Sequence, residues 1–300
     1  KNTAQQEIFF DIKKSLANLG INHKIFFNEN SLYDEGKVEE LLNTFKEKNL
    51  SYEKDGAVWL KFSELGQTED KVIVKNTGEP TYRLPDIAYH IIKLSRGYDL
   101  LVDIFGTDHI DEYPDVSAGL SALGYDSSKV KVLIYQFVNI MDGGEVVKMS
   151  TRKANYITLD ELNDEVGKDV IRYFFNMRNI NSHMIFDLAI AKKQSEENPV
   201  FYLQYAHARI CSILRRVKEE QLEVSINHLD LLTHEDEQSL IKALHNFKEE
   251  VLLSAENLET HRLCTYLYDL AGWYHRFNRS CRILGTERNL AQARLTLAYA

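Results

Sequence analysis

The sequence contains no run of apolar residues that approaches the roughly 20 that a membrane-spanning helix needs. Its first four residues include neither an initiator methionine nor the apolar core of a secretion signal. With a hydrophobic content of 44%, the 300 residues can still bury a sizeable core. The absences argue against the membrane and secreted classes, and we expect a cytoplasmic protein with no membrane partner.

Cysteine is scarce, and no two cysteines are spaced as a Cys-x-x-Cys pair. Cys211, Cys264 and Cys281 are odd in number and far apart, which predicts free structural thiols instead of disulfides. This spacing also offers no zinc site, because structural zinc is held by close pairs of Cys and His. We expect no resident metal.

An excess of positive charge is missing too, since the formal net charge is −9. This balance excludes a protein coated uniformly in cations for nucleic acid, but not a local basic face. From Thr260 onward only Asp269 and Glu287 oppose a set of arginines, which is either a nucleic-acid contact or a solvated helix face. The set is Arg262, Arg276, Arg279, Arg282, Arg288 and Arg294.

Repeats, low-complexity segments and Pro- or Gly-rich linkers are absent, so domains must be inferred from changes in pattern. Apolar segments at 100–105, interrupted by Asp103, and at 131–138 flank a helical pattern at 115–123. This order predicts a βαβ crossover in a parallel sheet. Pro85 is well placed as the first residue of a helix.

The second half of the chain has a different pattern of predicted elements. Asp142-Gly143-Gly144 is a hairpin signal, and one helix is predicted over 159–178. From Asn198 onward the pattern is almost wholly helical, and the last helix has no stop signal. We therefore expect an α/β part followed by an all-α part, in a chain that is cut at both ends.

A basic loop at 148–153 (KMSTRK) combines three cations with two hydroxyls between a strand and a helix. Such a loop can wrap a polyphosphate, with cations matching the charge that develops when pyrophosphate leaves. An exposed basic turn would have the same residues. The residues alone leave both interpretations open.

A second group of residues lies at the start of the helix near Pro85. A carboxylate at Asp86 can take a guanidinium in a two-pronged pair, while the ring of Tyr82 covers its face. Alternatively, Asp86 stabilises its own helix N-terminus and Tyr82 belongs to the core. Asp108 and His109 follow the strand at 100–105, at the edge where open α/β sheets place ligands.

Several strings resemble one family, the arginyl-tRNA synthetases. KMSTR resembles the KMSKS-type signature of class I synthetases and departs from the commoner KMSKR at Thr151. Residues 81–90 (TYRLPDIAYH) resemble the family's arginine-binding segment, and GTDH resembles its GADHH string, departing at Thr107 and Ile110. Residues 52–60 (YEKDGAVWL) are similar to its insertion module, and 198–209 (NPVFYLQYAHAR) to the opening of its tRNA-binding domain.

The resemblance implies a fold and a domain order. The expected fold is the second half of a class I Rossmann-type catalytic domain with an insertion module, followed by a helical-bundle anticodon-binding domain. The expected domains are 1–80 (insertion module and partial catalytic domain), 81–145 (second half of the Rossmann-type domain), 146–194 (KMSKS-type loop and connecting helices) and 195–300 (anticodon-binding domain, truncated at its C-terminus).

The resemblance also implies a function, arginine-tRNA ligase, with ATP, Mg²⁺, L-arginine and tRNA(Arg) as substrates and partners of a monomer. The implied catalytic residues are Lys148, Met149, Ser150 and Arg152. The implied arginine-binding residues are Tyr82 and Asp86, and those implied for ATP are Asp108, His109, Lys148, Arg152 and Lys153. We expect three arginines to contact tRNA: Arg276, Arg279 and Arg282. Four aromatic residues of the same region have two interpretations: Tyr266, Trp273, Tyr274 and Phe277. They either stack on tRNA bases or lie in the protein core, and their helical spacing favours the core.

The family's HIGH-type motif is missing, since no His-x-Gly-His string occurs. We therefore expect these residues alone to be an inactive fragment of the enzyme. The main alternative is a synthetase-like, tRNA-binding paralogue without aminoacylation activity. A cysteine-specific synthetase would need a zinc site that the cysteines do not offer, and a purely helical structural protein would leave the βαβ pattern and the basic loop unexplained.

Overall fold

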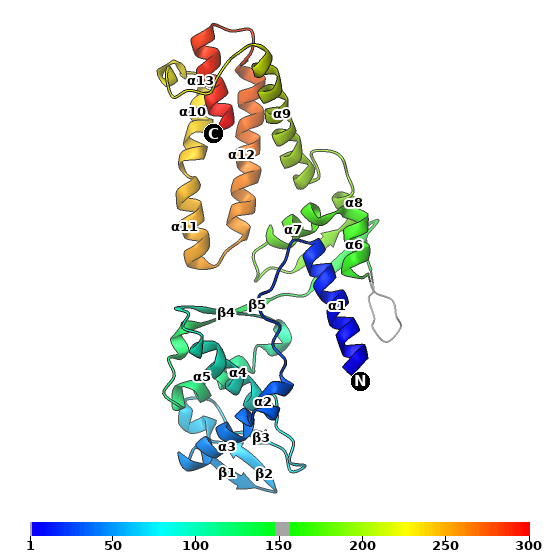
Figure 1. The fold of residues 1–300 in the computed structure, drawn as a ribbon, viewed down its shortest axis with the longest axis vertical. Coiled ribbons are helices and arrows are strands. Elements are labelled where there is room, and N and C mark those ends of the chain that lie inside the picture. The colour runs from blue at the N-terminus through cyan, green and yellow to red at the C-terminus, as the bar shows by residue number, and fades with distance from the viewer. Residues whose placement is uncertain (1, 148–156) are drawn as a thin grey trace. The chain divides into compact units, whose positions relative to one another are not determined.

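The computed structural model describes residues 2–147 and 157–300. These residues form two compact units, a small unit (His23–Phe137) and a large unit (Lys1–Asn22 with Val138–Ala300), shown in Figure 1. Within the described ranges, no helix combines the length and the apolar character that crossing a membrane requires. The cysteines are free thiols, as predicted.

The small unit packs helices against two small sheets. Its helices are α2 (Asn30–Asp34), α3 (Lys37–Glu47), α4 (Arg83–Ser95) and α5 (Tyr113–Ala122). Its strands are β1 (Ser51–Lys54), β2 (Ala57–Leu60), β3 (Lys71–Val74), β4 (Leu101–Gly106) and β5 (Val130–Tyr135). Strands β1, β2 and β3 form an antiparallel sheet, whereas β4 and β5 pair in parallel.

The parallel pair confirms the predicted βαβ crossover. Leu101 pairs with Val130 and Gly106 with Tyr135, so the two strands run in register along their whole length. Helix α5 connects them and packs against α4. A Cβ atom at Gly119 of α5 would lie 2.6 Å from Cδ1 of Ile87, so any larger residue would force this buried side chain to shift where the two helices meet. This contact fixes α4 against the crossover.

Helix α4 begins at Arg83, two residues earlier than predicted from Pro85. Tyr82 is its N-cap, and Pro85 lies inside the first turn. Proline is tolerated there because the first amides of a helix have no intrahelical acceptor. The earlier start places Asp86 at the end of the first turn, with its amide donating to the carbonyl of Tyr82 at 3.1 Å.

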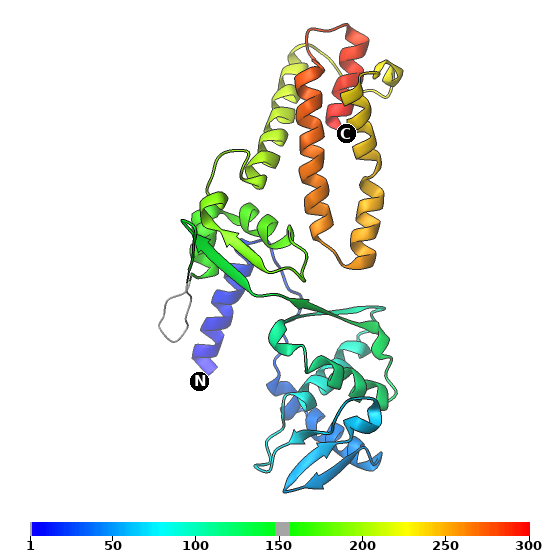
Figure 2. The same ribbon diagram turned by 180° about the vertical axis from the view of Figure 1, so that it is seen from behind.

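The large unit has a small sheet and a helical bundle. Its strands are β6 (Val138–Asp142), β7 (Glu145–Val146) and β8 (Met184–Asp187), drawn in green in Figure 2. Its first helices are α1 (Asn2–Asn18), α6 (Leu159–Val166), α7 (Lys168–Asn176) and α8 (Leu188–Ala191). The bundle contains α9 (Pro199–Glu219), α10 (Glu235–His245), α11 (Phe247–Asn257), α12 (His261–Ser280) and α13 (Arg288–Tyr299).

Two glycine positions decide local structure here. Gly143 and Gly144 have φ of 59° and 88° and connect β6 to β7 as a two-residue hairpin, which confirms the turn predicted from sequence. The prediction of one helix over 159–178 is wrong, because Gly167 has a φ of 81° and separates α6 from α7. With a ψ of 158°, this is an extended conformation of positive φ that is open essentially only to glycine, and it breaks the helical hydrogen-bond ladder.

The bundle is organised around α12, which packs against α9, α10 and α11. Its core includes the fully buried Phe277 together with Tyr274 and Leu295. Tyr274 is 4% exposed and Phe277 0%, so the core interpretation of these two aromatics is confirmed. Burial raises the pKa of the Tyr274 phenol to about 12.

Candidate functional site

Part of the predicted site cannot be placed. The KMSTRK residues lie outside the described ranges: Lys148, Met149, Ser150, Arg152 and Lys153. Directly after this segment, Thr158 caps α6. Its Oγ1 accepts from the Glu161 amide at 3.1 Å, and its own amide donates to the Glu161 carboxylate at 2.7 Å. This capping box fixes where α6 begins.

Asp86 and His109 come together in the small unit. They line one cavity of about 220 Å³ between α4, the end of β4 and α5. Phe105, Val116 and Leu120 form part of its apolar wall, and Lys131 of β5 also lines it. The cavity therefore combines apolar walls with a few ionisable groups, as small-molecule sites usually do.

Tyr82 and Asp108 are not among the residues that line this cavity. Tyr82 is 76% exposed at the N-cap of α4, which excludes a core role for its ring. The Asp108 side chain folds back over Gly106, where an added Cβ would lie 2.5 Å from its Oδ1. Asp108 follows β4 directly, at the C-terminal end of that strand.

The cavity changes the acid–base properties of Asp86. Asp86 lines this cavity although the residue as a whole is exposed, and the loss of water contact around its carboxyl raises its pKa. His90 and Lys93 oppose this shift, whereas the carboxylates of Glu112 and Glu29 add to it. A carboxylate surrounded in this way gains by binding a cation. Neither Glu29 nor Glu112 lies in a string that predicts a site from the sequence.

A buried ion network supports the floor of the site. The Asp103 carboxylate contacts His90 Nε2 at 2.6 Å and accepts from Lys93 Nζ at 2.5 Å. His90 Nδ1 donates to the main-chain carbonyl of Asp86 at 2.7 Å. The network thus connects β4 to the first turn of α4. The sequence signal for this network was Asp103, a single charged residue within an otherwise apolar strand, because a buried charge needs a partner.

We expect Asp103→Asn to destabilise the small unit by about 3 kcal/mol at pH 7, because it leaves the ammonium group of Lys93 without its counter-charge. Burial alone would raise the pKa of the Asp103 carboxyl, but hydrogen bonds from His90 and Lys93 outweigh it and lower that pKa. The ion network therefore stabilises the fold above the unfolded pKa of about 3.9, and the contribution is lost as the pH falls below it.

Amide hydrogen exchange in β4 and α4, measured on the 300-residue chain at several pH values, checks this expectation. The exposed carboxylate of Asp99, just before β4, provides the matched control Asp99→Asn. Equal protection of β4 in the two variants at pH 7 would contradict the role given to Asp103.

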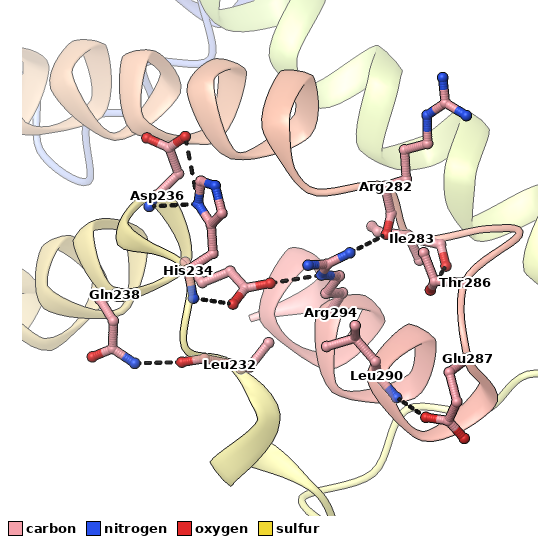
Figure 3. A network of polar contacts seen from close by, with 11 residues as sticks. Leu232, His234, Asp236, Gln238, Arg282, Ile283, Thr286, Glu287, Leu290 and Arg294 are labelled. Atoms are coloured by element: carbon pink, nitrogen blue, oxygen red, sulfur yellow. Dashed lines mark hydrogen bonds and ion pairs between the residues drawn. The ribbon is translucent and has the colours of Figure 1, made fainter.

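The arginines of the bundle divide into two groups. Arg262 is paired with Glu250 at 3.0 Å, and Arg294 Nε donates to the buried Glu237 at 2.6 Å. Arg294 also donates to the main-chain carbonyl of Arg282 at 2.8 Å, while the guanidinium of Arg282 points away from this network (Figure 3). The exposed members are the three predicted to contact tRNA, Arg276, Arg279 and Arg282, together with Arg288.

Helix α9 adds residues that the sequence analysis missed. The Arg209 guanidinium lies 5.0 Å from the Tyr205 ring centre, and His275 of α12 lies 5.6 Å from the same ring. Burial lowers the pKa of His275, and the cations of Arg209 and Arg279 lower it further. Cations and aromatic rings from α9 and α12 therefore gather on one face, a pairing suited to phosphates and unpaired bases.

Comparisons with known proteins give matches along nearly the whole chain. The catalytic-domain model of class I tRNA synthetases (R) matches residues 2–187, and the model of the DALR anticodon binding domain matches residues 203–300. The arginine–tRNA ligase of Salinibacter ruber is 50% identical over 302 residues, covering 99% of this chain and 53% of that protein. The enzyme of Desulfotalea psychrophila is 47% identical, covering 100% and 55%.

Solved structures also match this chain. A Campylobacter jejuni protein provisionally named an arginyl-tRNA synthetase matches with a TM-score of 0.87 and 30% identity, over 99% of this chain and 65% of its own. Thermus thermophilus arginyl-tRNA synthetase matches with a TM-score of 0.78 and 20% identity, over 95% of this chain and 58% of its own. This match supports the fold. The chain spans about half the length of the curated relatives it matches. Because the catalytic-domain model matches more than half of its residues, the chain belongs to the class I aminoacyl-tRNA synthetases of the arginine type.

Proposed function

We propose that this chain supplies the arginine pocket, the KMSKS-type loop and the tRNA-binding bundle of an arginine-tRNA ligase. The observation that carries the proposal is Asp86, which lies in the first turn of α4 and lines a cavity together with His109. A cavity with a carboxylate of raised pKa suits a cationic side chain such as guanidinium. We assign to Tyr82, the exposed N-cap residue of the same helix, the role of covering the face of that ligand.

In the proposed reaction the carboxylate of L-arginine attacks the α-phosphorus of ATP, and pyrophosphate leaves. A ribose hydroxyl of the tRNA terminus then attacks the carbonyl of the arginyl adenylate, and AMP leaves. Catalysis is largely positioning and charge stabilisation. We assign ATP contacts to Asp108 and His109, and pyrophosphate contacts to the cations of the KMSTRK loop. Mg²⁺ enters with ATP as part of the substrate, and the enzyme acts as a cytoplasmic monomer.

The direct test is transfer of each labelled amino acid onto total tRNA, with ATP and Mg²⁺. It compares the polypeptide encoded by the complete reading frame with the 300-residue chain. We expect the first to charge arginine alone and the second, which contains no His-x-Gly-His string, to charge nothing. No charging by the complete polypeptide would instead support a tRNA-binding paralogue without aminoacylation activity. Charging by the 300 residues would mean that the ATP site is wrongly assigned.

For the bundle, we expect Arg279→Ala and Arg276→Ala each to weaken tRNA binding by the 300-residue chain about 3- to 10-fold. The slope of log K against log salt should fall by about 1 for each, since each removes one phosphate contact. Filter binding at several salt concentrations measures both quantities. Lys248→Ala, on α11, is the control for loss of one exposed cation. An equal effect of all three variants would show that tRNA responds only to overall charge.

A further inference from the structure

The loop that connects α9 to α10, residues 220–234, exposes a group of apolar side chains beside α13 (Figure 1). These side chains are Val224, Ile226, Leu229 and Leu231. Ile226 alone keeps 83% of its surface accessible to water. Single exposed apolar residues are common on protein surfaces, whereas a concentration of them in one short segment is typical of an interaction site.

Helix α13 holds the first part of this loop by hydrogen bonds at regular intervals. Three α13 residues spaced about one turn apart reach three alternate residues of the loop. Arg288 Nη2 donates to the Gln221 carbonyl at 3.1 Å, Gln292 Nε2 donates to the Glu223 carbonyl at 3.1 Å, and Thr296 Oγ1 accepts from the Ser225 amide at 3.0 Å. On either side of the exposed group, Leu222 and Leu232 are buried in the bundle core. The fold therefore fixes the apolar side chains in their exposed positions.

The same segment is acidic. From residue 219 to residue 236 the sequence has six acidic residues and no lysine or arginine. They are Glu219, Glu220, Glu223, Asp230, Glu235 and Asp236. The first four are exposed, and none of these four forms an ion pair with another residue that the structure describes. The exposed apolar group is thus surrounded by carboxylates without counter-charges.

These two properties select the chemistry of a ligand. Carboxylates without counter-charges repel phosphate, so the loop is a poor surface for nucleic acid or for an anionic membrane. They attract lysine and arginine, and the apolar side chains need an apolar surface to cover them. A basic amphipathic helix offers both, with apolar residues along one face and cations beside them.

We propose that the loop 220–234 is a docking site for a partner protein that offers a basic amphipathic helix. The apolar face of that helix covers the side chains around Ile226, and its cations pair with Glu220 and Glu223. This site goes beyond the proposed function, because it contains none of the residues assigned to arginine, ATP or tRNA.

Fluorescence anisotropy with the 300-residue chain tests the proposal. The probe is a fluorescein-labelled peptide of about 18 residues that carries leucines on one helix face and lysines on the other. A second peptide, with serine in place of each leucine, measures the effect of charge alone, and we expect it to bind about 10-fold more weakly. Ile226→Ser should weaken binding of the leucine–lysine peptide about 10-fold, because it removes apolar area from the centre of the interface. Its matched control is Leu252→Ser, at an exposed apolar position of α11, which should leave the affinity unchanged.

The role of the carboxylates is tested separately. The double variant Glu220→Gln/Glu223→Gln should weaken binding of the leucine–lysine peptide about 3- to 10-fold and reduce its dependence on salt, because two charges leave the interface. The control Glu249→Gln/Glu256→Gln removes the same charge from exposed positions of α11. Since all the substituted side chains are exposed, thermal unfolding should stay the same in every variant.

Three results would overturn the proposal. The first is equal affinity of the Ile226→Ser and Leu252→Ser variants for the leucine–lysine peptide. The second is displacement of the peptide by tRNA together with weaker tRNA binding by Ile226→Ser, which would assign the loop to tRNA. The third is a dimer in sedimentation velocity that Ile226→Ser abolishes, which would make a second copy of the chain the occupant.

Discussion

Asp86→Asn should lower kcat/KM for arginine by about 100- to 1000-fold in the polypeptide of the complete reading frame. The reason is the loss of the proposed charge-assisted, two-pronged pair with the substrate, since removing one partner of such a pair costs about 2–5 kcal/mol. Asparagine keeps the size of the side chain and one acceptor oxygen, but its amide group opposes the guanidinium donors. Initial rates of tRNA charging over a range of arginine concentrations measure the effect.

Two comparisons make this result specific. Asp99→Asn, an exposed carboxylate in the loop before β4, should leave arginine kinetics unchanged. Arginine binding should also weaken as the pH falls, and at a higher pH than an ordinary aspartate would give, because burial and then Glu112 and Glu29 keep the pKa of Asp86 raised. An Asp86→Asn enzyme with normal KM and kcat would show that the guanidinium binds elsewhere.

The part of the fold that depends on local sequence was predictable. Two apolar segments around a helical pattern predicted the parallel β4–β5 pair, and Gly143-Gly144 predicted the hairpin, because both signals act within a few residues. The break at Gly167 was missed because the apolar spacing continues on both sides of it, and only the backbone conformation ends the helix. The earlier start of α4 is a smaller error of the same kind.

The candidate site was only half predictable. Tyr82, Asp86 and His109 were named because their strings resemble those of one family, whereas Glu112 and Glu29 carry no such signal and reach Asp86 only through the fold. Asp103 did carry a signal, as a charge in an apolar strand, but its partners His90 and Lys93 lie on another element. Contacts between residues distant in sequence arise from packing, which periodicity does not show.

The arginine-rich end of the chain illustrates the same limit. Composition alone made all the arginines after Thr260 equal candidates for tRNA, yet Arg262 and Arg294 balance acidic residues inside the bundle. Arg294 and Glu237 are 57 residues apart in sequence. Only the exposed members of the group are left for a phosphate backbone, so part of the basic sequence stabilises the domain instead of binding nucleic acid.

Glu237→Gln should destabilise the bundle by about 3–5 kcal/mol, because it leaves the guanidinium of Arg294 buried without a counter-charge. The Glu237 side chain is 1% exposed and that of Arg294 is 13%. Glu237 also accepts from the main-chain amide of His234 at 2.9 Å, a cap that glutamine can still provide. The loss should therefore report on the ion pair, measured as the free energy of opening from hydrogen exchange in α10 and α13.

The matched control is Glu235→Gln, in the first turn of α10, which removes an exposed charge close to the buried Glu237. It should lower the stability of the bundle by less than about 0.5 kcal/mol. Arg294→Met should be as harmful as Glu237→Gln, since it leaves the carboxylate buried and unpaired. The double variant should then lose clearly less than the sum of the two, because neither charge remains. Strictly additive losses would mean that Glu237 and Arg294 stabilise the bundle separately, through the cap and through the carbonyl of Arg282.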